Sequence, residues 1–185
     1  MSRIGKLPIP VPKGVDVQIA EENTVTVKGP KGTLSRQLHP TMILAQDDGV
    51  VRVQRPDDSR ISRALHGLTR TLLNNMVVGV TTGYRKSLII NGVGYRVAKD
   101  GQDAVFTVGY SHPVRVTPPP GIAFATEGNN RIHVDGIDKQ MVGEVAAKLH
   151  AIREPEPYLG KGIAYEGERI RRKQGKTGTK GKGKK

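Results

Sequence analysis

Apolar and polar positions alternate in two long stretches of the chain, and the second stretch repeats the pattern of the first. Sliding the sequence along itself aligns Val25 with Val105, Gly29 with Gly109 and Leu34 with Val114. A shift that is longer by a single position aligns Val51 with Ile132, Asp57 with Asp138, Ile61 with Val142 and Leu68 with Leu149. Self-similarity at a nearly fixed separation predicts a duplicated structural unit.

In the first half, the pattern predicts strands followed by one helix. Alternating apolar positions over 15–19 and 25–27 indicate half-buried strands, and Gly29-Pro-Lys-Gly32 supplies a turn. The helix follows three candidate caps, which are Asp57, Asp58 and Ser59. Its apolar residues form one stripe that we expect to face the core, made of Ile61, Leu65, Leu68 and Leu72.

The second half repeats this order of elements. Strands at 88–90 and 95–97 are expected to pair with strands at 105–108 and 114–116. A helix is predicted from Lys139 to Ile152, after a candidate cap at Asp138. The side chains expected to face the core are Val142, Val145, Leu149 and Ile152.

A sheet covered on one face by a helix is an α+β layer arrangement. The sequence therefore predicts an α+β fold of two tandem similar modules, each a small antiparallel sheet covered by one helix, plus a basic C-terminal tail. We expect an N-terminal module over 1–82, a C-terminal module over 83–168 and a basic extension over 169–185.

Charge is concentrated in the extension. The chain has a formal net charge of +13, and residues 169–185 hold nine Lys or Arg and no acid, so subtracting these nine leaves +4 elsewhere. A segment this basic does not bury enough apolar surface to fold alone, and it favours a polyanionic partner. Ile170 is its only apolar residue, whereas binding to a membrane surface uses an apolar face beside the charge. Nucleic acid is the expected partner, and no membrane is expected.

Residue patterns typical of enzymes and metal sites are missing from the sequence. There is no Cys, and the five His residues share no metal-ligand spacing, so neither a metal nor a cofactor is expected. Asn91-Gly-Val-Gly-Tyr-Arg96 lacks the third glycine of a dinucleotide loop. We interpret it as a tight connection between strands, with backbone that meets a phosphate as the alternative. A small hydrolase using His66 or His112 is the remaining enzymatic alternative, but we expect no enzyme and no small-molecule substrate.

Residues 154–163 are the best candidate binding loop. Pro155 and Pro157 end the preceding helix and hold the chain extended. One aromatic ring, one lysine and two glycines then lead towards the basic run, a combination typical of an RNA-binding surface. The candidate RNA-binding residues are Tyr158, Gly160, Lys161, Gly162, Arg169, Arg171, Arg172, Lys173 and Lys176. A solvent-exposed connector is the alternative for the loop.

Six blocks of sequence stand out from one end of the chain to the other. They are Met1-Ser-Arg-Ile-Gly-Lys-Leu-Pro-Ile-Pro-Val-Pro-Lys-Gly-Val15, Val27-Lys-Gly-Pro-Lys-Gly-Thr-Leu34, Gly92-Val-Gly-Tyr-Arg-Val97, Gly109-Tyr-Ser-His-Pro-Val114, Pro155-Glu-Pro-Tyr-Leu-Gly-Lys-Gly-Ile163 and Arg171-Arg-Lys-Gln-Gly-Lys176. Together they resemble the bacterial large-subunit ribosomal protein six family, whose fold is also two similar α+β modules in tandem.

The resemblance implies a structural component of the large ribosomal subunit that binds large-subunit rRNA near the stalk base and the sarcin–ricin loop. It implies neighbouring ribosomal proteins as partners and a cytoplasmic, ribosome-bound location, and we expect no homo-oligomer. The family motif reads Tyr-Lys-Gly-Lys-Gly-Ile-Arg-Tyr, whereas Leu159 and Ala164 replace its first Lys and its Arg. Two potential phosphate contacts are therefore missing. Composition alone leaves a general RNA-binding or RNA-chaperone module as the alternative function.

Overall fold

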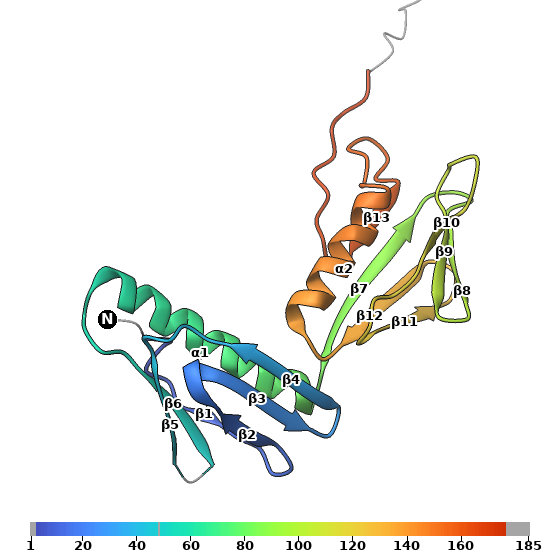
Figure 1. Cartoon of the computed structure of the whole chain (residues 1–185). Coiled ribbons are helices and arrows are strands. Elements are labelled where there is room, and N and C mark those ends of the chain that lie inside the picture. Colours follow the sequence, from blue (N-terminus) through green and yellow to red (C-terminus); the bar gives the residue numbers. More distant parts are fainter. Residues whose placement is uncertain (1–2, 48, 177–185) are drawn as a thin grey trace, which may run out of the picture. The chain divides into compact units, whose positions relative to one another are not determined.

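The computed structural model describes residues 3–47 and 49–176. The chain divides into two compact units in which helices accompany small antiparallel sheets (Figure 1). The first unit comprises Met1–Arg85, Pro120–Ile122 and Asp135–Gly143, and the second comprises Lys86–Pro119, Ala123–Val134 and Glu144–Lys185. The predicted fold class is confirmed: two similar α+β modules follow one another along the chain.

The first unit holds two three-stranded sheets and the helix α1. Its elements are β1 (Ile9–Pro10), β2 (Asp16–Ile19), the 3₁₀ turn η1 (Glu21–Asn23), β3 (Thr24–Gly29), β4 (Gly32–Gln37), β5 (Ile43–Asp47), β6 (Val50–Gln54) and α1 (Arg60–Thr81). The sheets have the orders β2-β3-β4 and β1-β6-β5. The β3–β4 hairpin closes at the pair Gly29–Gly32, where the sequence predicts a turn.

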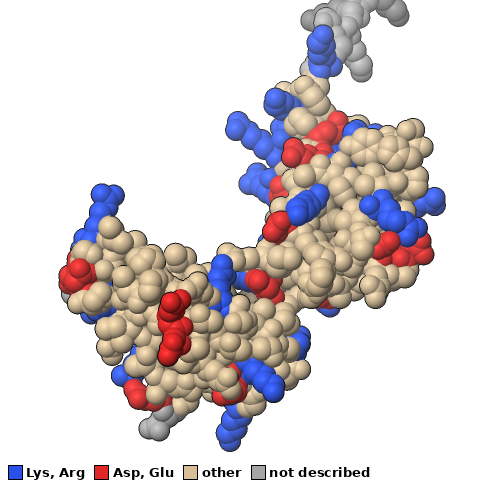
Figure 2. All heavy atoms as spheres, viewed as in Figure 1, with Lys and Arg blue, Asp and Glu red and all other residues tan. Residues whose placement is uncertain are grey.

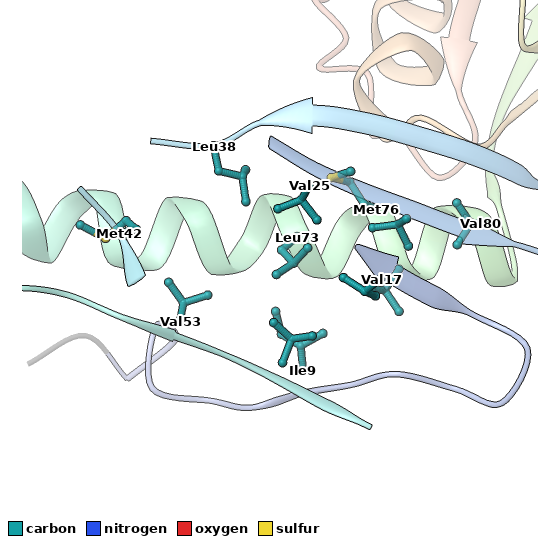
Figure 3. Packing of buried hydrophobic residues seen from close by; sticks show 12 residues of the cluster. Ile9, Val17, Val25, Leu38, Met42, Val53, Leu73, Met76 and Val80 are labelled. Carbon is teal, nitrogen blue, oxygen red and sulfur yellow. The ribbon is translucent and has the colours of Figure 1, made fainter. Parts of the chain in front are cut away.

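The core of the first unit lies between α1 and these strands (Figure 3). Leu73 of α1 is fully buried, and so are Val25 and Val27 of β3 and Val51 of β6. Each fully buried Val or Leu side chain contributes about 1.5–3 kcal/mol to folding through loss of apolar surface from water. The aliphatic residues thus supply this core without an aromatic side chain among its buried members.

Helix α1 begins at the predicted cap. The backbone N–H of Ser62 donates to the side-chain oxygen of Ser59 at 3.1 Å, which satisfies one of the free donors of the first turn. Asp57 accepts from the Ser59 hydroxyl at 2.9 Å and so orients the cap. Hydrogen bonds from Ser62 and Ser59 lower the pKa of the Asp57 carboxyl.

The stripe of α1 that was expected to face the core is wrong at two of its four positions. Ile61 is 72% exposed and Leu68 is 54% exposed, whereas Leu65 and Leu72 pack partly against the core. The buried positions in this part of the helix are polar, namely Ser62, His66 and Thr69. A hydrophobic pattern does not detect a buried face made of hydroxyls and an imidazole.

His66 shows how this polar face is satisfied. Its Nε2 lies 2.9 Å from the carbonyl oxygen of Val53, and its Nδ1 lies 3.1 Å from Nη1 of Arg55. Because a carbonyl only accepts and a guanidinium only donates, Nε2 carries the proton and Nδ1 accepts. Both ring nitrogens are therefore used, as buried polar atoms require.

The second half of the chain also forms two sheets and a helix. Its elements are β7 (Tyr84–Asn91), β8 (Arg96–Asp100), β9 (Asp103–Thr107), β10 (Val114–Val116), β11 (Ile122–Glu127), β12 (Arg131–Gly136), α2 (Lys139–Ile152) and β13 (Gly162–Tyr165). The sheet orders are β10-β9-β8 and β11-β12-β7-β13. In α2, Val142, Val145 and Leu149 are buried as predicted and Ile152 is half-buried.

The expected pairing of 88–90 with the strands at 105–108 and 114–116 is wrong. These residues belong to β7, which pairs antiparallel with β13, so that Leu88 lies opposite Tyr165 and Ile90 opposite Ile163. The expected pairing of 95–97 holds, because β8 pairs with β9 and β9 with β10. Strand β13 thus ties the candidate loop to a central strand of the larger sheet.

The predicted alignment of the two halves is also wrong by one residue at the strand that contains Val25. Val25 is buried, but Val105 is only half-buried, because its neighbours Ala104 and Phe106 occupy the core face of β9. A one-residue shift moves every side chain of a strand to the opposite face. Shortening the alignment shift by a single position brings the buried Val25 and Val27 onto Ala104 and Phe106.

Candidate nucleic-acid interface

The candidate loop is a closed turn between α2 and β13 in the second unit. The backbone N–H of Glu156 donates to the carbonyl oxygen of Lys161 at 2.9 Å, and that of Gly160 donates to the carbonyl of Glu156 at 3.1 Å. The N–H of Ile163 donates to the carbonyl of Arg153 at 2.8 Å, which fixes the entry into β13. The loop is thus held by its own backbone, which disfavours a loose connector.

Gly162 is required by close packing. It has φ +141°, and a Cβ at this position would lie 2.6 Å from the carbonyl oxygen of Glu154 and 2.8 Å from that of Arg153. Gly160 and Gly162 are both buried. The sequence suggested that these glycines open the backbone to a phosphate, whereas in the structure they let the chain approach itself.

The side chains around these glycines face solvent. Tyr158 is 53% exposed, and Leu159 and Lys161 are exposed as well. An exposed phenol beside an ammonium group offers one stacking surface and one cation to a ligand. Among the predicted binding residues of the loop, Tyr158 and Lys161 are therefore the two whose side chains are accessible to a ligand.

The structure brings the basic segment alongside this loop. The backbone N–H of Lys173 donates to the carbonyl oxygen of Pro157 at 2.8 Å. The guanidinium of Arg172 lies over Gly160, where a Cβ would be 3.2 Å from Nη2. Loop and segment, separated in the sequence, thus form one surface, which we call the loop–tail surface and define as residues 155–161 with 169–173.

The cations of this surface are not neutralised by the protein. Arg169, Arg171, Arg172, Lys173 and Lys176 are exposed, and none of them forms an ion pair within residues 3–47 and 49–176. Figure 2 shows Lys and Arg side chains projecting where the chain approaches its C-terminal end. The remainder of the predicted extension, 177–185, lies outside the described residues.

A tight turn places the basic segment directly after β13. The N–H of Tyr165 donates to the carboxylate of Glu168 at 2.9 Å, and the N–H of Glu168 donates to the carbonyl of Tyr165 at 3.1 Å. His150 of α2 stacks on the ring of Tyr165, with centroids 5.0 Å apart and planes 9° apart. These residues, which sequence reasoning missed, set the direction in which the segment leaves the sheet.

A second group that sequence reasoning missed lies next to the loop. Tyr95, Tyr110 and Arg153 line an open hollow of about 630 Å³ that also includes Leu159 and Lys161. The guanidinium carbon of Arg153 lies 5.4 Å from the centre of the Tyr110 ring, and the Tyr110 hydroxyl donates to the carbonyl of Ile152 at 2.8 Å. The available signal was the repeated Gly-Tyr pair at 94–95 and 109–110.

The alternatives of other function classes find little support. His66 is 3% exposed and both its ring nitrogens are bonded, so it is not free to serve as a general base. His112 is exposed, and its Nδ1 lies 3.4 Å from the hydroxyl of the neighbouring Ser111, with no carboxylate paired to it among the described residues. The described residues contain no cluster of side chains that could hold a metal ion. Within the same part of the chain, no helix combines the length and apolarity needed to cross a membrane.

Comparison with known sequences identifies the family. The model of the family described as Ribosomal protein L6 matches residues 11–83 and 91–166, which are most of both halves. The chain belongs to the Ribosomal protein L6 family. The two matched segments of the L6 family agree with the two modules of the fold.

Close relatives cover the chain almost completely. "Large ribosomal subunit protein uL6" of Thermomicrobium roseum is 63% identical over 183 residues, which are 98% of this chain and 100% of the relative. The proteins of the same name from Carboxydothermus hydrogenoformans and Roseiflexus sp. are 60% and 59% identical, over 98% and 96% of this chain and 100% and 98% of their own lengths. Since the L6 family consists of structural ribosomal proteins, the chain is not an enzyme.

Proposed function

We propose that this protein is a structural component of the large ribosomal subunit that binds large-subunit rRNA through the loop–tail surface. The observation that carries the proposal is the 2.8 Å hydrogen bond from the Lys173 N–H to the Pro157 carbonyl. It joins the exposed Tyr158 and Lys161 to a run of unpaired cations in one continuous surface.

The surface suits recognition of RNA by shape and phosphate position. Arginine and lysine side chains neutralise phosphates and release counterions, which supplies most of the affinity. A folded RNA is then distinguished by where its phosphates and unpaired bases lie. The rigid turn around Gly162 holds Tyr158 and Lys161 at fixed positions, whereas a free basic peptide has no such geometry.

The family resemblance extends this proposal to a location and to partners. By that resemblance, the rRNA site lies near the stalk base and the sarcin–ricin loop, and the protein is cytoplasmic and ribosome-bound. Neighbouring ribosomal proteins are its other partners, and the protein acts as one copy. The names of the three relatives above, each a large-subunit protein, support the large subunit as the assembly.

Chemical footprinting of isolated large-subunit rRNA with the full chain tests the proposal. We expect protection confined to one folded region at physiological salt, and loss of part of it with the variant Lys161→Gln plus Arg171→Gln. Lys13→Gln plus Lys28→Gln, which removes two exposed cations from the first unit, is the matched control and should leave the footprint intact. Diffuse protection that disappears at moderate salt would point instead to a general RNA-binding module.

A further inference from the structure

The hollow beside the loop has features that a scaffold alone does not need. Tyr110 is 44% exposed although its hydroxyl is bonded, so its ring faces solvent from a fixed position. His112 lies next to it, with ring centroids 6.5 Å apart and planes 24° apart. These two exposed, nearly parallel rings at the β9–β10 connection form an aromatic surface, and exposed aromatic rings are the usual stacking partners of an unpaired base.

The ring of Tyr95 supports this surface from within. Its ring is 2.9 Å from the position that a Cβ would take at Gly92, and its hydroxyl is 2.9 Å from the corresponding position at Gly109. Both glycines have positive φ, at 142° and 80°. The two connections that carry Gly92 and Gly109 therefore close around one tyrosine, which fixes the place of the Tyr110 ring.

Arg153 adds a positive charge that no carboxylate neutralises. Hydrogen bonds to the side chain of Tyr110, together with the influence of Tyr95, raise its pKa, and within the described residues it forms no ion pair. A guanidinium held by phenols rather than by carboxylates keeps its charge available for a phosphate. The Tyr110 ring and the Arg153 cation thus line the same hollow, with the guanidinium carbon over the ring.

The acidic residues that line the hollow indicate which class of ligand it can bind. Glu154 and Glu156 also line it, and their carboxylates repel a bare phosphate but accept hydrogen bonds from the amino and imino groups of a base. The hollow of about 630 Å³ falls within the ~300–1,000 Å³ range of small-ligand sites. A nucleotide matches all three kinds of group. Its base can stack on an aromatic ring and donate hydrogen bonds to the carboxylates, and its phosphate can bind the cation.

We propose that this hollow binds a single unpaired nucleotide of RNA, with its base packed against Tyr110 and its phosphate at Arg153. The inference rests on the proposed rRNA-binding function, because Lys161 belongs both to the hollow and to the loop–tail surface. It adds Tyr110, His112 and Arg153 to the interface, and it assigns stacking to a site outside the basic segment.

Substitutions in the full chain test separately how the Tyr110 ring, the Tyr110 hydroxyl and the Arg153 charge contribute to RNA affinity. Tyr110→Leu should lower affinity for a large-subunit rRNA fragment about 5- to 150-fold, equivalent to ~1–3 kcal/mol for one stacked base. Tyr110→Phe keeps the ring and should retain most of the affinity. Arg153→Gln should reduce the slope of log K against log salt by about 0.7, as for one phosphate contact. Arg131→Gln, which removes an arginine already paired with Glu127, is the charge control.

Probing of the Watson–Crick edges of the bases gives the second measurement. Tyr110→Leu should expose one unpaired base while the rest of the footprint persists. The inference is overturned if Tyr110→Leu matches the wild type, or if Tyr110→Phe loses as much affinity as Tyr110→Leu at equal thermal stability. It is also overturned if a cross-linker at position 110 in assembled subunits captures a protein instead of rRNA. If the wild-type protein itself gives no localised footprint, the proposed function fails, which is a distinguishable result.

Discussion

At position 159 the chain presents an exposed apolar side chain in the candidate binding loop. Leu159 lies between Tyr158 and Gly160, where the family motif has a lysine. Leu159→Lys should therefore raise affinity for rRNA and steepen the salt dependence by about 0.7–0.9 in log–log slope, because one more phosphate is neutralised. Titrations at several salt concentrations measure both quantities.

The control for this substitution is Ile43→Lys, which adds the same charge at an exposed position of β5. An equal gain from both variants would mean that net charge, and not the loop, determines affinity. Ala164, the other departure from the motif, is buried in β13. Its replacement of an arginine therefore changes the packing of the strand as well as removing a cation.

The close packing around Gly162 predicts that a larger residue at this position lowers stability. Gly162→Ala places a methyl group against the carbonyl oxygen of Glu154 and keeps a backbone angle that L-residues avoid. We expect the free energy of unfolding to fall by at least ~1–3 kcal/mol, the cost of backbone strain at one residue. Urea denaturation followed by circular dichroism measures this loss.

Gly143→Ala is the matched control, since Gly143 lies in α2 with open space around its Cα. That variant should be neutral or stabilising by about 0.5–1 kcal/mol, because alanine favours the helix. Equal destabilisation by both substitutions would contradict the role assigned to Gly162.

At the scale of elements, the core-facing side of α2 can be predicted from the sequence, whereas that of α1 cannot. In α2 the buried residues are aliphatic, and the periodicity predicts them correctly. In α1 the first buried turns carry Ser62, His66 and Thr69, so the apolar period points to Ile61 and Leu68 instead. The existence and position of both helices followed from the sequence, whereas the orientation of α1 depended on hydrogen bonds with β6 and its flanking residues.

The orientation of α1 predicts opposite outcomes for two leucines of the same helix. Leu73→Ala should lower the free energy of unfolding by about 2–5 kcal/mol, because it empties a fully buried site. Leu68→Ala should change it by less than about 0.5 kcal/mol, as expected at an exposed position. Chemical denaturation of both variants compares them, and a reversed order would restore the orientation expected from periodicity.

The hydrogen bonds at the start of α1 predict that the stability of the protein depends on pH. Because hydrogen bonds from Ser62 and Ser59 lower the pKa of Asp57, its contribution to stability is present above the ordinary value of 3.8 and is lost as pH falls through the lowered value. Asp57→Asn should therefore be less stable than the wild type at pH 7, and the difference should disappear in acid. Melting temperatures of both proteins from pH 2 to pH 7 measure this effect, and a difference that persists unchanged at pH 2 would contradict the role assigned to Asp57.

Local sequence patterns predict where strands lie, but they do not reliably predict which strands pair. Strand β7 opens the second half of the chain, whereas its partner β13 follows only after α2, and the closed loop between α2 and β13 brings that partner into position. The nine candidate residues were proposed from charge, composition and the family motif, and their part in binding stays a prediction. The Tyr110 and Arg153 group was not, because its members come together only when separate connections fold over Tyr95.

At the scale of the whole molecule, positive charge is divided unequally. Removal of residues 169–185 leaves +4 of the +13 charge on the chain. This truncation should lower affinity for large-subunit rRNA strongly at low salt and flatten the salt dependence, because several phosphate contacts are lost. Unchanged affinity and slope would remove the extension from the binding mechanism. The proposed module limits, 1–82 and 83–168, would be tested by limited proteolysis.

The polar core face of α1 also bears on how far the two similar modules could replace one another. Ser62, His66 and Thr69 are buried on α1, whereas the buried residues of α2 are aliphatic, such as Val142, Ala146 and Leu149. A helix transplanted from the second module into the first would leave the carbonyl of Val53 and the guanidinium of Arg55 without their shared imidazole. Each module is thus matched to its own helix, and the two helices are not interchangeable despite the similar folds around them.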